Sequence, residues 1–492
     1  FRSNNNINQT GAVTMVSNPG TTAAVLTYDV STGNSASSIV AGSLTITGTN
    51  TGPIDYNLFA AGAQLNPGVI SVPGTITLDN TYGGTSGLGG APTSGYITAS
   101  NLSLATTNIG IVVDSALSAN RGVVIRGASY GGTNTMGIRI WSNITSSQGN
   151  IDLTGFTQSG QAMSNLNPNV SWVVATISAP LGSINATGTV AGTDGYGVDF
   201  YGNMPLSAKS ISVLGTGSLA SGVATRLGSL TILAGGSDLL VVGNNSNQAG
   251  TGISISQGTI ANNAIGGSIT FRSNNNINQT TAIGMVGNTS GHAAALTYDV
   301  TTGTNASSIV GGNLTITGSS TSPINYNLLA SGAHLDGGAL TIPGTITLDN
   351  TYGGTAGVGG TPASGFIGSA NISRAVATEG ITINNAMTAA NGIVIKGVSS
   401  GSNAINTSST LTATTGDVTI SGTSGTSTGY TGGGALVASA GNVVLTGVST
   451  SGSAVNFSGT VTASAGNIVI TGNSASTGNI WGALASGLIT AK

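Results

Sequence analysis

Four copies of one heptapeptide decide the fold of this chain: Asn391-Gly-Ile-Val-Ile-Lys-Gly397, Gly416-Asp-Val-Thr-Ile-Ser-Gly422, Gly441-Asn-Val-Val-Leu-Thr-Gly447 and Gly466-Asn-Ile-Val-Ile-Thr-Gly472. The copies begin at a constant interval, and apolar residues stand two and four positions into each of them. The first apolar column is Ile393, Val418, Val443 and Ile468, and the second is Ile395, Ile420, Leu445 and Ile470. A spacing of two is the period of a β-strand, because alternate side chains leave opposite faces, and it excludes a helix here.

Two further apolar columns follow in each 25-residue unit. The third is Ile405, Tyr430, Val455 and Ile480, and the fourth is Leu411, Leu436 and Val461, which ends at Ser486. Three strand-like patches per unit predict one coil of a parallel β-solenoid, in which inward residues stack on their counterparts in neighbouring coils. The glycines that close each heptapeptide are expected to supply positive φ or tight corners. With coils ~4.8 Å apart, we predict an all-β rod of about 25 residues per coil, with surface loops or hairpins at its corners.

A longer repeat contains these coils. The decapeptide Phe1 to Thr10 returns letter for letter at Phe271 to Thr280, and the similarity continues to about Gly127 and Gly397. A fixed period indicates an array. We predict one continuous solenoid with a first large repeat at residues 1–270 and an incomplete second repeat at 271–492, whose regular coils occupy 391–492. Because the chain opens inside a repeat, it is expected to be a segment of a longer protein. Predicted surface loops or outward hairpins are Gly83–Ser94, Gly353–Ser364 and Ser159–Pro168.

Composition narrows the possible functions. The 492 residues include 80 glycines and no cysteine, and 10 Lys and Arg against 13 Asp and Glu give a net charge of −3. Such a chain offers no basic surface for nucleic acid, and no apolar stretch approaches the ~20 residues of a membrane-spanning helix. Gly, Ser and Thr tracts often stay disordered, but short regular runs of β-branched residues favour a folded chain here. The lack of cysteine is consistent with an exported protein.

Carboxylates that could carry chemistry are few. β-Helical enzymes need carboxylates that converge on one face. Asp194 and Asp199 lie in one Gly-rich stretch and are a candidate Ca²⁺ site, although Asp beside Gly is more commonly a turn residue. Asp79 and Asp349 recur with the large repeat and are expected to cap turns.

The basic residues give a second set of candidates. His292 and His334 replace Thr22 and Gln64 of the first copy and have no metal-binding neighbour in sequence. Recurring basic positions, expected on solvated faces or in corner hydrogen bonds, are Arg2 with Arg272 and Arg126 with Lys396. Arg139 and Trp141 could stack a sugar, although an outer-face pair on a strand is the commoner arrangement. We therefore predict no catalytic residue, no cofactor and no metal site, apart from the calcium candidate at Asp194 and Asp199.

These features resemble those of the haemagglutinin-repeat adhesins of Gram-negative bacteria, the filamentous-haemagglutinin-like and large autotransporter passenger proteins. The resemblance rests on the tandem heptapeptides, on the runs Gly42-Ser-Leu-Thr-Ile46 and Gly312-Asn-Leu-Thr-Ile316, and on the near absence of charge and cysteine. It implies a right-handed parallel β-helix, export across the outer membrane, and work as a surface fibre or adhesin. The family's secretion domain has no match in this sequence.

The expected function is therefore structural. We expect a segment of a giant exported surface protein that forms an elongated fibre or stalk for adhesion, biofilm or filament formation, without catalysis. Its expected location is the bacterial cell surface, and its expected partners are neighbouring repeats, like chains and cell-surface glycans. Two alternatives stay open: a β-helical carbohydrate-active enzyme, either a polysaccharide lyase or a hydrolase, and a filament subunit that stacks end to end through exposed strand edges.

Overall fold

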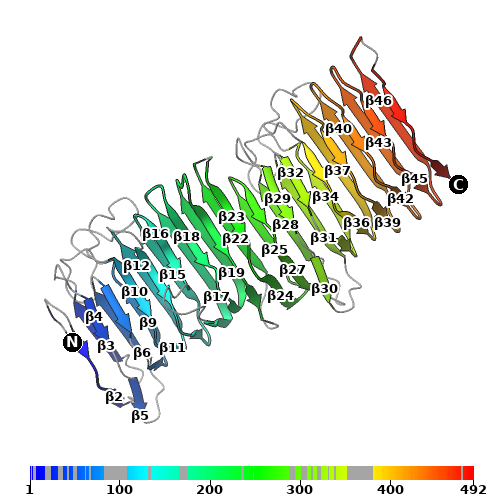
Figure 1. The fold of residues 1–492 in the computed structure, drawn as a ribbon. Coiled ribbons are helices and arrows are strands. Elements are labelled where there is room, and N and C mark those ends of the chain that lie inside the picture. Colours follow the sequence, from blue (N-terminus) through cyan, green and yellow to red (C-terminus); the bar gives the residue numbers. More distant parts are fainter. Residues whose placement is uncertain are drawn as a thin grey trace. The chain divides into compact units, whose positions relative to one another are not determined.

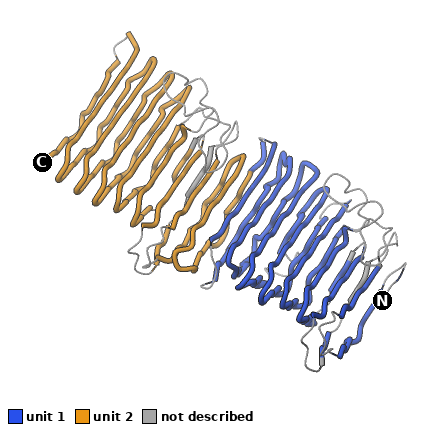
Figure 2. The backbone as a smooth tube through the Cα atoms, turned by 180° about the vertical axis from the view of Figure 1, so that it is seen from behind, with its two compact units in different colours: residues 1–251 blue, residues 252–492 orange. Residues whose placement is uncertain are grey.

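The fold was obtained as a computed structural model. It describes residues 1–492 except 2, 4–6, 17–23, 31–36, 41–43, 48–52, 61, 66–67, 82–107, 131–134, 166–173, 234–237, 248, 288–293, 301–306, 312–313, 318–322, 331, 337–338, 352–379 and 478–479. The chain divides into two compact units, Phe1–Thr251 and Gly252–Lys492 (Figure 2). Every regular element in the described part of each unit is a β-strand, and strands of successive coils pair in parallel (Figure 1). Each unit is a parallel β-solenoid, as the apolar columns predicted.

Each coil of unit 1 passes through three walls, which we number in chain order. The first wall consists of β1 (Asn8–Gln9), β4 (Ser37–Val40), β7 (Gly62–Leu65), β10 (Ile109–Val113), β13 (Met136–Ile140), β16 (Gly160–Ser164), β18 (Gly195–Phe200) and β20 (Val223–Leu227). The second consists of β2 (Val13–Val16), β5 (Leu44–Thr47), β8 (Val69–Val72), β11 (Ala116–Ala119), β14 (Ile144–Ser146) and β21 (Leu230–Ile232). The third consists of β3 (Ala24–Val30), β6 (Ile54–Ala60), β9 (Thr75–Asp79), β12 (Gly122–Ser129), β15 (Ile151–Thr157) and β22 (Leu239–Asn245). Two long strands, β17 (Ile177–Val190) and β19 (Met204–Gly217), run through both the second and the third wall.

Unit 2 repeats this plan. Its first wall consists of β23 (Thr251–Ile255), β26 (Ile277–Gln279), β29 (Ser307–Gly311), β32 (Gly332–Asp336), β35 (Ile381–Ile383), β38 (Ile405–Thr407), β41 (Tyr430–Gly432), β44 (Val455–Phe457) and β47 (Ala483–Ala485). The second consists of β24 (Thr259–Ile265), β27 (Ala282–Val286), β30 (Leu314–Thr317), β33 (Ala339–Ile342), β36 (Ala386–Ala389), β39 (Leu411–Ala413), β42 (Leu436–Ala438), β45 (Val461–Ala463) and β48 (Ile489–Ala491). The third consists of β25 (Ile269–Ser273), β28 (Ala294–Val300), β31 (Ile324–Ala330), β34 (Thr345–Asp349), β37 (Gly392–Ser399), β40 (Val418–Ser424), β43 (Val443–Ser449) and β46 (Ile468–Ser474). No helix among the described residues is long and apolar enough to span a bilayer.

The predicted apolar columns form the interior of the regular coils. Adjacent members pair in register along the third wall: Ile393 with Val418, Val418 with Val443, Val443 with Ile468, Ile395 with Ile420, Ile420 with Leu445 and Leu445 with Ile470. All of these side chains are buried except Ile468 and Ile470, which are half-buried. The residues between them face outward and are half-exposed or exposed, so alternation along each strand separates the core from the surface.

The third and fourth columns change register after Phe457. Val455 pairs with Ala483 and Val461 with Ile489, each three positions beyond the partner that the regular interval predicts. Ile480 therefore does not stand in the third column, and the fourth column does not end at Ser486, contrary to the prediction. Ser474 still pairs with Ser449 at the regular interval, so three additional residues enter between Ser474 and Ala483. A prediction that places column members at a constant interval of residues cannot detect such an insertion.

The glycines that close the heptapeptides pair with one another from coil to coil: Gly397, Gly422, Gly447 and Gly472. Positive φ occurs elsewhere among the described glycines, for example 89° at Gly160. A Cβ on Gly447 would lie 2.0 Å from the carbonyl oxygen of Ala454 at the start of the next first-wall strand. The closing glycines are thus required by the close approach of two walls at a tight corner. Of the two predicted reasons for glycine here, the tight corner applies and positive φ does not.

A ladder of serines closes the same corner: Ser399, Ser424 and Ser449 are buried, and Ser474 at its end is half-buried. The Oγ of Ser424 donates to the carbonyl of Ser402 at 2.7 Å and accepts from the backbone N–H of Ser427 at 2.9 Å. Ser449 repeats both bonds one coil later, to Ser427 at 2.6 Å and from Gly452 at 2.8 Å. Each hydroxyl therefore satisfies corner backbone groups that would otherwise lose their partners on burial.

The two large repeats share their coil lengths and then diverge. In unit 1 the first-wall positions pair as Asn8 with Ile39, Ile39 with Gln64 and Gln64 with Val112. Unit 2 has the same three pairs, each displaced by the length of the large repeat: Asn278 with Ile309, Ile309 with His334 and His334 with Thr382. The next coil differs, because the step from Val112 to Arg139 is three residues longer than the step from Thr382 to Asn406. The structural divergence begins where the sequence similarity ends.

One predicted loop is wrong and two others lie outside the described residues. Within Ser159–Pro168, residues Gly160–Ser164 form strand β16 of the first wall, and its last three side chains are buried. Strand β16 is short and contains Gly, Gln and Ser among its five residues, so its composition is that of a loop. The segments Gly83–Ser94 and Gly353–Ser364 fall outside the described part of the chain.

Candidate functional site on the first wall of unit 1

The recurring Asp79 and Asp349 hold a corner of the fold. Asp79 ends β9, and its Oδ1 accepts from the backbone N–H of Thr81 at 2.8 Å and from the Thr81 hydroxyl at 2.5 Å. Its Oδ2 lies 3.3 Å from Nη1 of Arg126 in the next coil. Asp349 makes the same bonds to Thr351 at 2.9 and 2.5 Å, and its Oδ2 lies 3.8 Å from Nζ of Lys396. Both aspartates therefore cap turns.

An asparagine completes each of these corners. The side-chain amide of Asn80 donates to the carbonyl of Ala128 at 2.7 Å and accepts from the backbone N–H of Ala128 at 2.6 Å. Asn350 makes the same two bonds with Val398, at 2.8 and 2.6 Å. The side-chain amide of each asparagine thus supplies both the donor and the acceptor that the backbone of a paired strand residue would supply.

The two buried aspartates predict an unusual dependence of stability on pH. Burial raises the pKa of Asp79 and Asp349 above 3.8, against the opposing effect of the threonine hydrogen bonds and the neighbouring cation. The folded chain therefore takes up these protons at higher pH than the unfolded chain. Their contribution to stability is full below the unfolded pKa and is lost as pH rises through the folded pKa.

We expect the parent chain to gain stability, relative to an Asp79→Asn/Asp349→Asn double variant, as pH falls from 7 towards 4. Asparagine keeps the oxygen that accepts from threonine, so the comparison isolates the titration. Urea midpoints of both proteins at pH 4 and pH 7 measure the effect. The same change in midpoint for the two proteins would contradict the assignment.

The calcium candidates Asp194 and Asp199 have separate partners. Asp199 in β18 is fully buried, and both of its oxygens accept from Arg226 in β20: Oδ1 from Nε at 2.7 Å and Oδ2 from Nη2 at 2.6 Å. Asp194 is exposed in the turn before β18 and accepts from the hydroxyl of Ser221. Among the described residues, no three His, Asp or Glu side chains gather closely enough to hold a metal ion. We interpret Asp199 as half of an ion pair rather than as a calcium ligand.

Arg226 is held by aromatic rings as well as by Asp199. Its guanidinium carbon lies 3.9 Å from the ring centre of Tyr196 and 4.4 Å from that of Tyr201, and Nη1 donates to the Tyr196 hydroxyl at 3.1 Å. Burial alone would lower the pKa of Arg226, but the hydrogen bonds and charge of Asp199 outweigh burial and raise it. Arg226 is therefore a fixed, fully charged part of the outer side of the wall.

A second arginine stacks on an aromatic ring in the same wall. Arg139 in β13 and Trp141 just after it are two residues apart, so both lie on the outer side while Ile138 and Ile140 point inward. The guanidinium carbon of Arg139 lies 3.7 Å from the ring centre of Trp141. Register pairing connects the two arginines through one column: Arg139, Ser164, Asp199 and Arg226. We call Arg139, Trp141, Tyr196, Asp199, Tyr201 and Arg226 the arginine face.

Part of this face was predictable from the sequence. Arg139 and Trp141 were visible because two residues at strand spacing share a side. The partnership of Asp199 with Arg226 was missed because these residues lie in successive coils at an interval that differs from that of the regular coils. The signal that could have found it is the alignment of Tyr196-Gly-Val-Asp-Phe200 with Val223-Ala-Thr-Arg-Leu227, in which apolar residues and opposite charges coincide.

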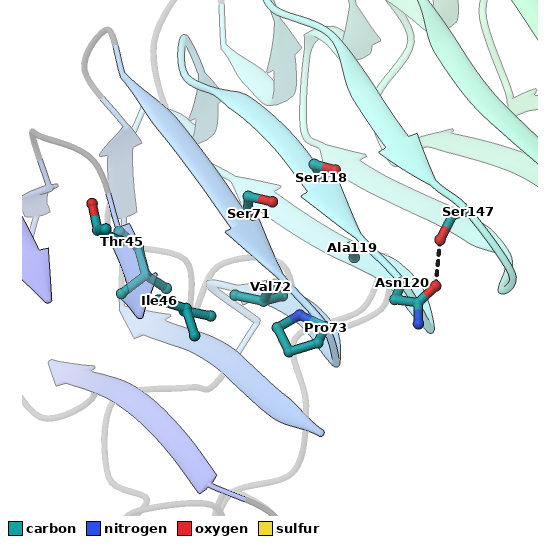
Figure 3. A pocket seen from close by; sticks show the side chains of 10 residues that line it. Thr45, Ile46, Ser71, Val72, Pro73, Ser118, Ala119, Asn120 and Ser147 are labelled. Carbon is teal, nitrogen blue, oxygen red and sulfur yellow. Dashed lines mark hydrogen bonds between the residues drawn. The ribbon is translucent and has the colours of Figure 1, made fainter. Parts of the chain in front are cut away.

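A neutral groove lies on the second wall of unit 1. It encloses about 550 Å³, and the residues around it are Leu44, Thr45, Ile46, Ser71, Val72, Pro73, Ser118, Ala119, Asn120 and Ser147 (Figure 3). Strands β5 and β8 pair only through Leu44 and Ile70 in the described structure, which leaves space between them. The hydroxyl of Ser147 donates to Oδ1 of Asn120 at one end (Figure 3). The groove offers hydroxyl and amide groups but no charge.

The remaining candidates take scattered positions. His334 lies half-buried in β32, with Nε2 3.1 Å from Nδ2 of Asn384. Arg272 lies half-buried in β25 and pairs in register with Asp299. His292 and Arg2 lie outside the described residues.

The fold places this chain in the class of repetitive parallel β-solenoid proteins. No protein-family model matches the chain, and no curated protein resembles it closely enough to count as a relative.

Proposed function

We propose that this chain is a structural segment of an elongated, exported surface fibre or stalk. The observation that carries the proposal is how its scarce charged residues are used. Asp79, Asp349 and Asp199 each pair with a cation of the next coil. These carboxylates thus stabilise the contact between successive coils.

The hydrogen bonds support the same function. Backbone groups of each regular coil bond to the coils on either side, as Val418 does to Asn442 and Val443 to Asn467, each at 2.9 Å. The surface adds a ladder, because Oδ1 of Asp417 accepts from the backbone of Asn442 at 2.7 Å and Oδ1 of Asn442 from that of Asn467 at 2.8 Å. Because each coil stabilises the next, such a structure can be lengthened by repeating one simple sequence. The resemblance to haemagglutinin-repeat adhesins favours the bacterial cell surface as its location.

Electron microscopy of the native cells, with antibodies against residues 391–492, tests this proposal. We expect gold label along thin surface fibres, with an axial repeat of about 40–50 Å set by a ~4.8 Å rise per coil. Label confined to the cell interior, or surface label without fibres, would contradict the proposal. The mass of the native polypeptide, measured in the same preparation, separates a single long chain from stacked subunits.

A further inference from the structure

Arg139 lacks the partners that the fold gives to Arg226. Its side chain is half-buried, and its Nε is fully buried without a hydrogen-bond partner. Within the described part of the chain, the only groups that act on its guanidinium are the ring of Trp141 and the more distant charge of Asp114. Burial lowers the pKa of Arg139 and Asp114 opposes that effect, but an arginine stays charged at neutral pH. The wall therefore presents a positioned cation with unused donors.

Arg226 shows which partner the fold provides for an arginine that is stacked on an aromatic ring. Both arginines lie in the same outer column and stack on aromatic rings at 3.7 and 3.9 Å. One coil before Arg226, the column holds Asp199, whose carboxylate accepts both arms of the guanidinium. One coil before Arg139, the same column holds Val112, whose side chain can accept nothing. The fold supplies a carboxylate to the first arginine and none to the second.

We propose that Arg139 binds the carboxylate of an acidic saccharide, a uronic acid unit of a polysaccharide that lies along the first wall of unit 1. A guanidinium whose plane is fixed by Trp141 is suited to a planar carboxylate, with which it forms two parallel hydrogen bonds. Gln161 lies in β16, the strand of the next coil that pairs with β13. The Oε1 of Gln161 is buried without a partner in the described structure.

The surroundings favour a saccharide over other anions. The side-chain amide of Gln161 matches the donors and acceptors of a sugar ring. The inference does not depend on the fibre function, because the site belongs to unit 1 alone and its test measures binding by the isolated chain.

Isothermal titration calorimetry of the chain at low salt tests the inference. The ligands are an oligogalacturonate and a neutral galacto-oligosaccharide of equal length. We expect binding of the acidic oligomer only, and Arg139→Gln should weaken it about tenfold or more through the loss of a charge-assisted contact. Arg139→Lys keeps the charge but loses the fork, so its affinity should fall between the two. Arg121→Gln, which removes the same charge from the exposed turn after β11, is the matched control and should bind like the parent.

Thermal unfolding distinguishes this binding function from a structural one. Because Arg139 donates no hydrogen bond within the described structure, Arg139→Gln should unfold within a degree or two of the parent. Three outcomes would overturn the inference: no binding by the parent, equal affinity of Arg139→Gln, or equal binding of the neutral oligomer. Loss of stability without loss of affinity would likewise assign Arg139 a structural function.

Discussion

Replacing Arg226 with methionine is expected to destabilise unit 1 by about 3–5 kcal/mol at pH 7, because it leaves the carboxylate of Asp199 buried without a counter-charge. Asp199 has no exposed surface, and both of its oxygens accept from Arg226. Asp199→Leu should cost a similar amount, since it removes both carboxylate acceptors from an arginine whose side chain is four-fifths buried. Urea denaturation followed by circular dichroism measures both effects.

The double variant Asp199→Leu/Arg226→Met provides the decisive comparison. Two apolar side chains in contact leave no buried charge, so the double variant should lose far less than the sum of the single variants. The penalty of Arg226→Met should also shrink in acid. Burial raises the pKa of Asp199, and without the opposing effect of Arg226 the folded state binds its proton at still higher pH, so stability returns as pH falls through that pKa. Additive losses with no pH dependence would show that the pair does not act as a buried ion pair.

The fold was predictable because its strongest signal is local and repeated. The columns of Ile393 and Ile395 combine strand spacing within a heptapeptide with a fixed interval between heptapeptides. Only stacked parallel coils bring both regularities into one core, and the pairing of Ile393 with Val418 follows directly. Where the interval between heptapeptides is constant, the period of the sequence by itself determines which residues pair between neighbouring strands.

The errors arose where the interval changes. Ile480 was assigned to a column that belongs to Ala483, because three added residues leave the apolar pattern looking intact. Gly160–Ser164 was assigned to a loop, because a short first-wall strand has too few apolar residues to show alternation. In both cases the register is fixed by the neighbouring coils, which no local pattern reports.

The candidate site was harder to predict for the same reason. Arg139 and Trp141 lie at strand spacing, which indicated a common face, whereas Asp199 meets Arg226 only across a complete coil of irregular length. The difference between Arg139 and Arg226 depends on what the preceding coil places in one column, Val112 or Asp199. That comparison requires the register of each coil.

Gly447→Ala is expected to destabilise unit 2 by about 3 kcal/mol or more, at the upper end of the cost of overpacking. The added methyl would lie 2.0 Å from the carbonyl oxygen of Ala454, 2.5 Å from its carbon and 2.6 Å from Cγ2 of Val455. Two of these are backbone atoms held by interstrand bonds, so relief requires the first and third walls to separate. The same contact recurs at Gly422, where the oxygen of Gly429 would lie at 1.9 Å.

Gly433→Ala supplies the matched control for this prediction. Gly433 lies in the same coil, has ordinary backbone φ, and a Cβ built on it meets only the Oγ of Ser458 at 4.0 Å. Alanine there restricts the unfolded chain without a clash, so its effect should be neutral or a gain of about 0.4–1 kcal/mol. The contrary result in thermal unfolding is an equal loss of stability for the two variants. In that case the backbone flexibility of glycine, and not contact between the walls, would explain why glycine recurs at the end of each heptapeptide. A loss confined to Gly447→Ala would establish that the closing glycines set the distance at which successive walls of each coil meet.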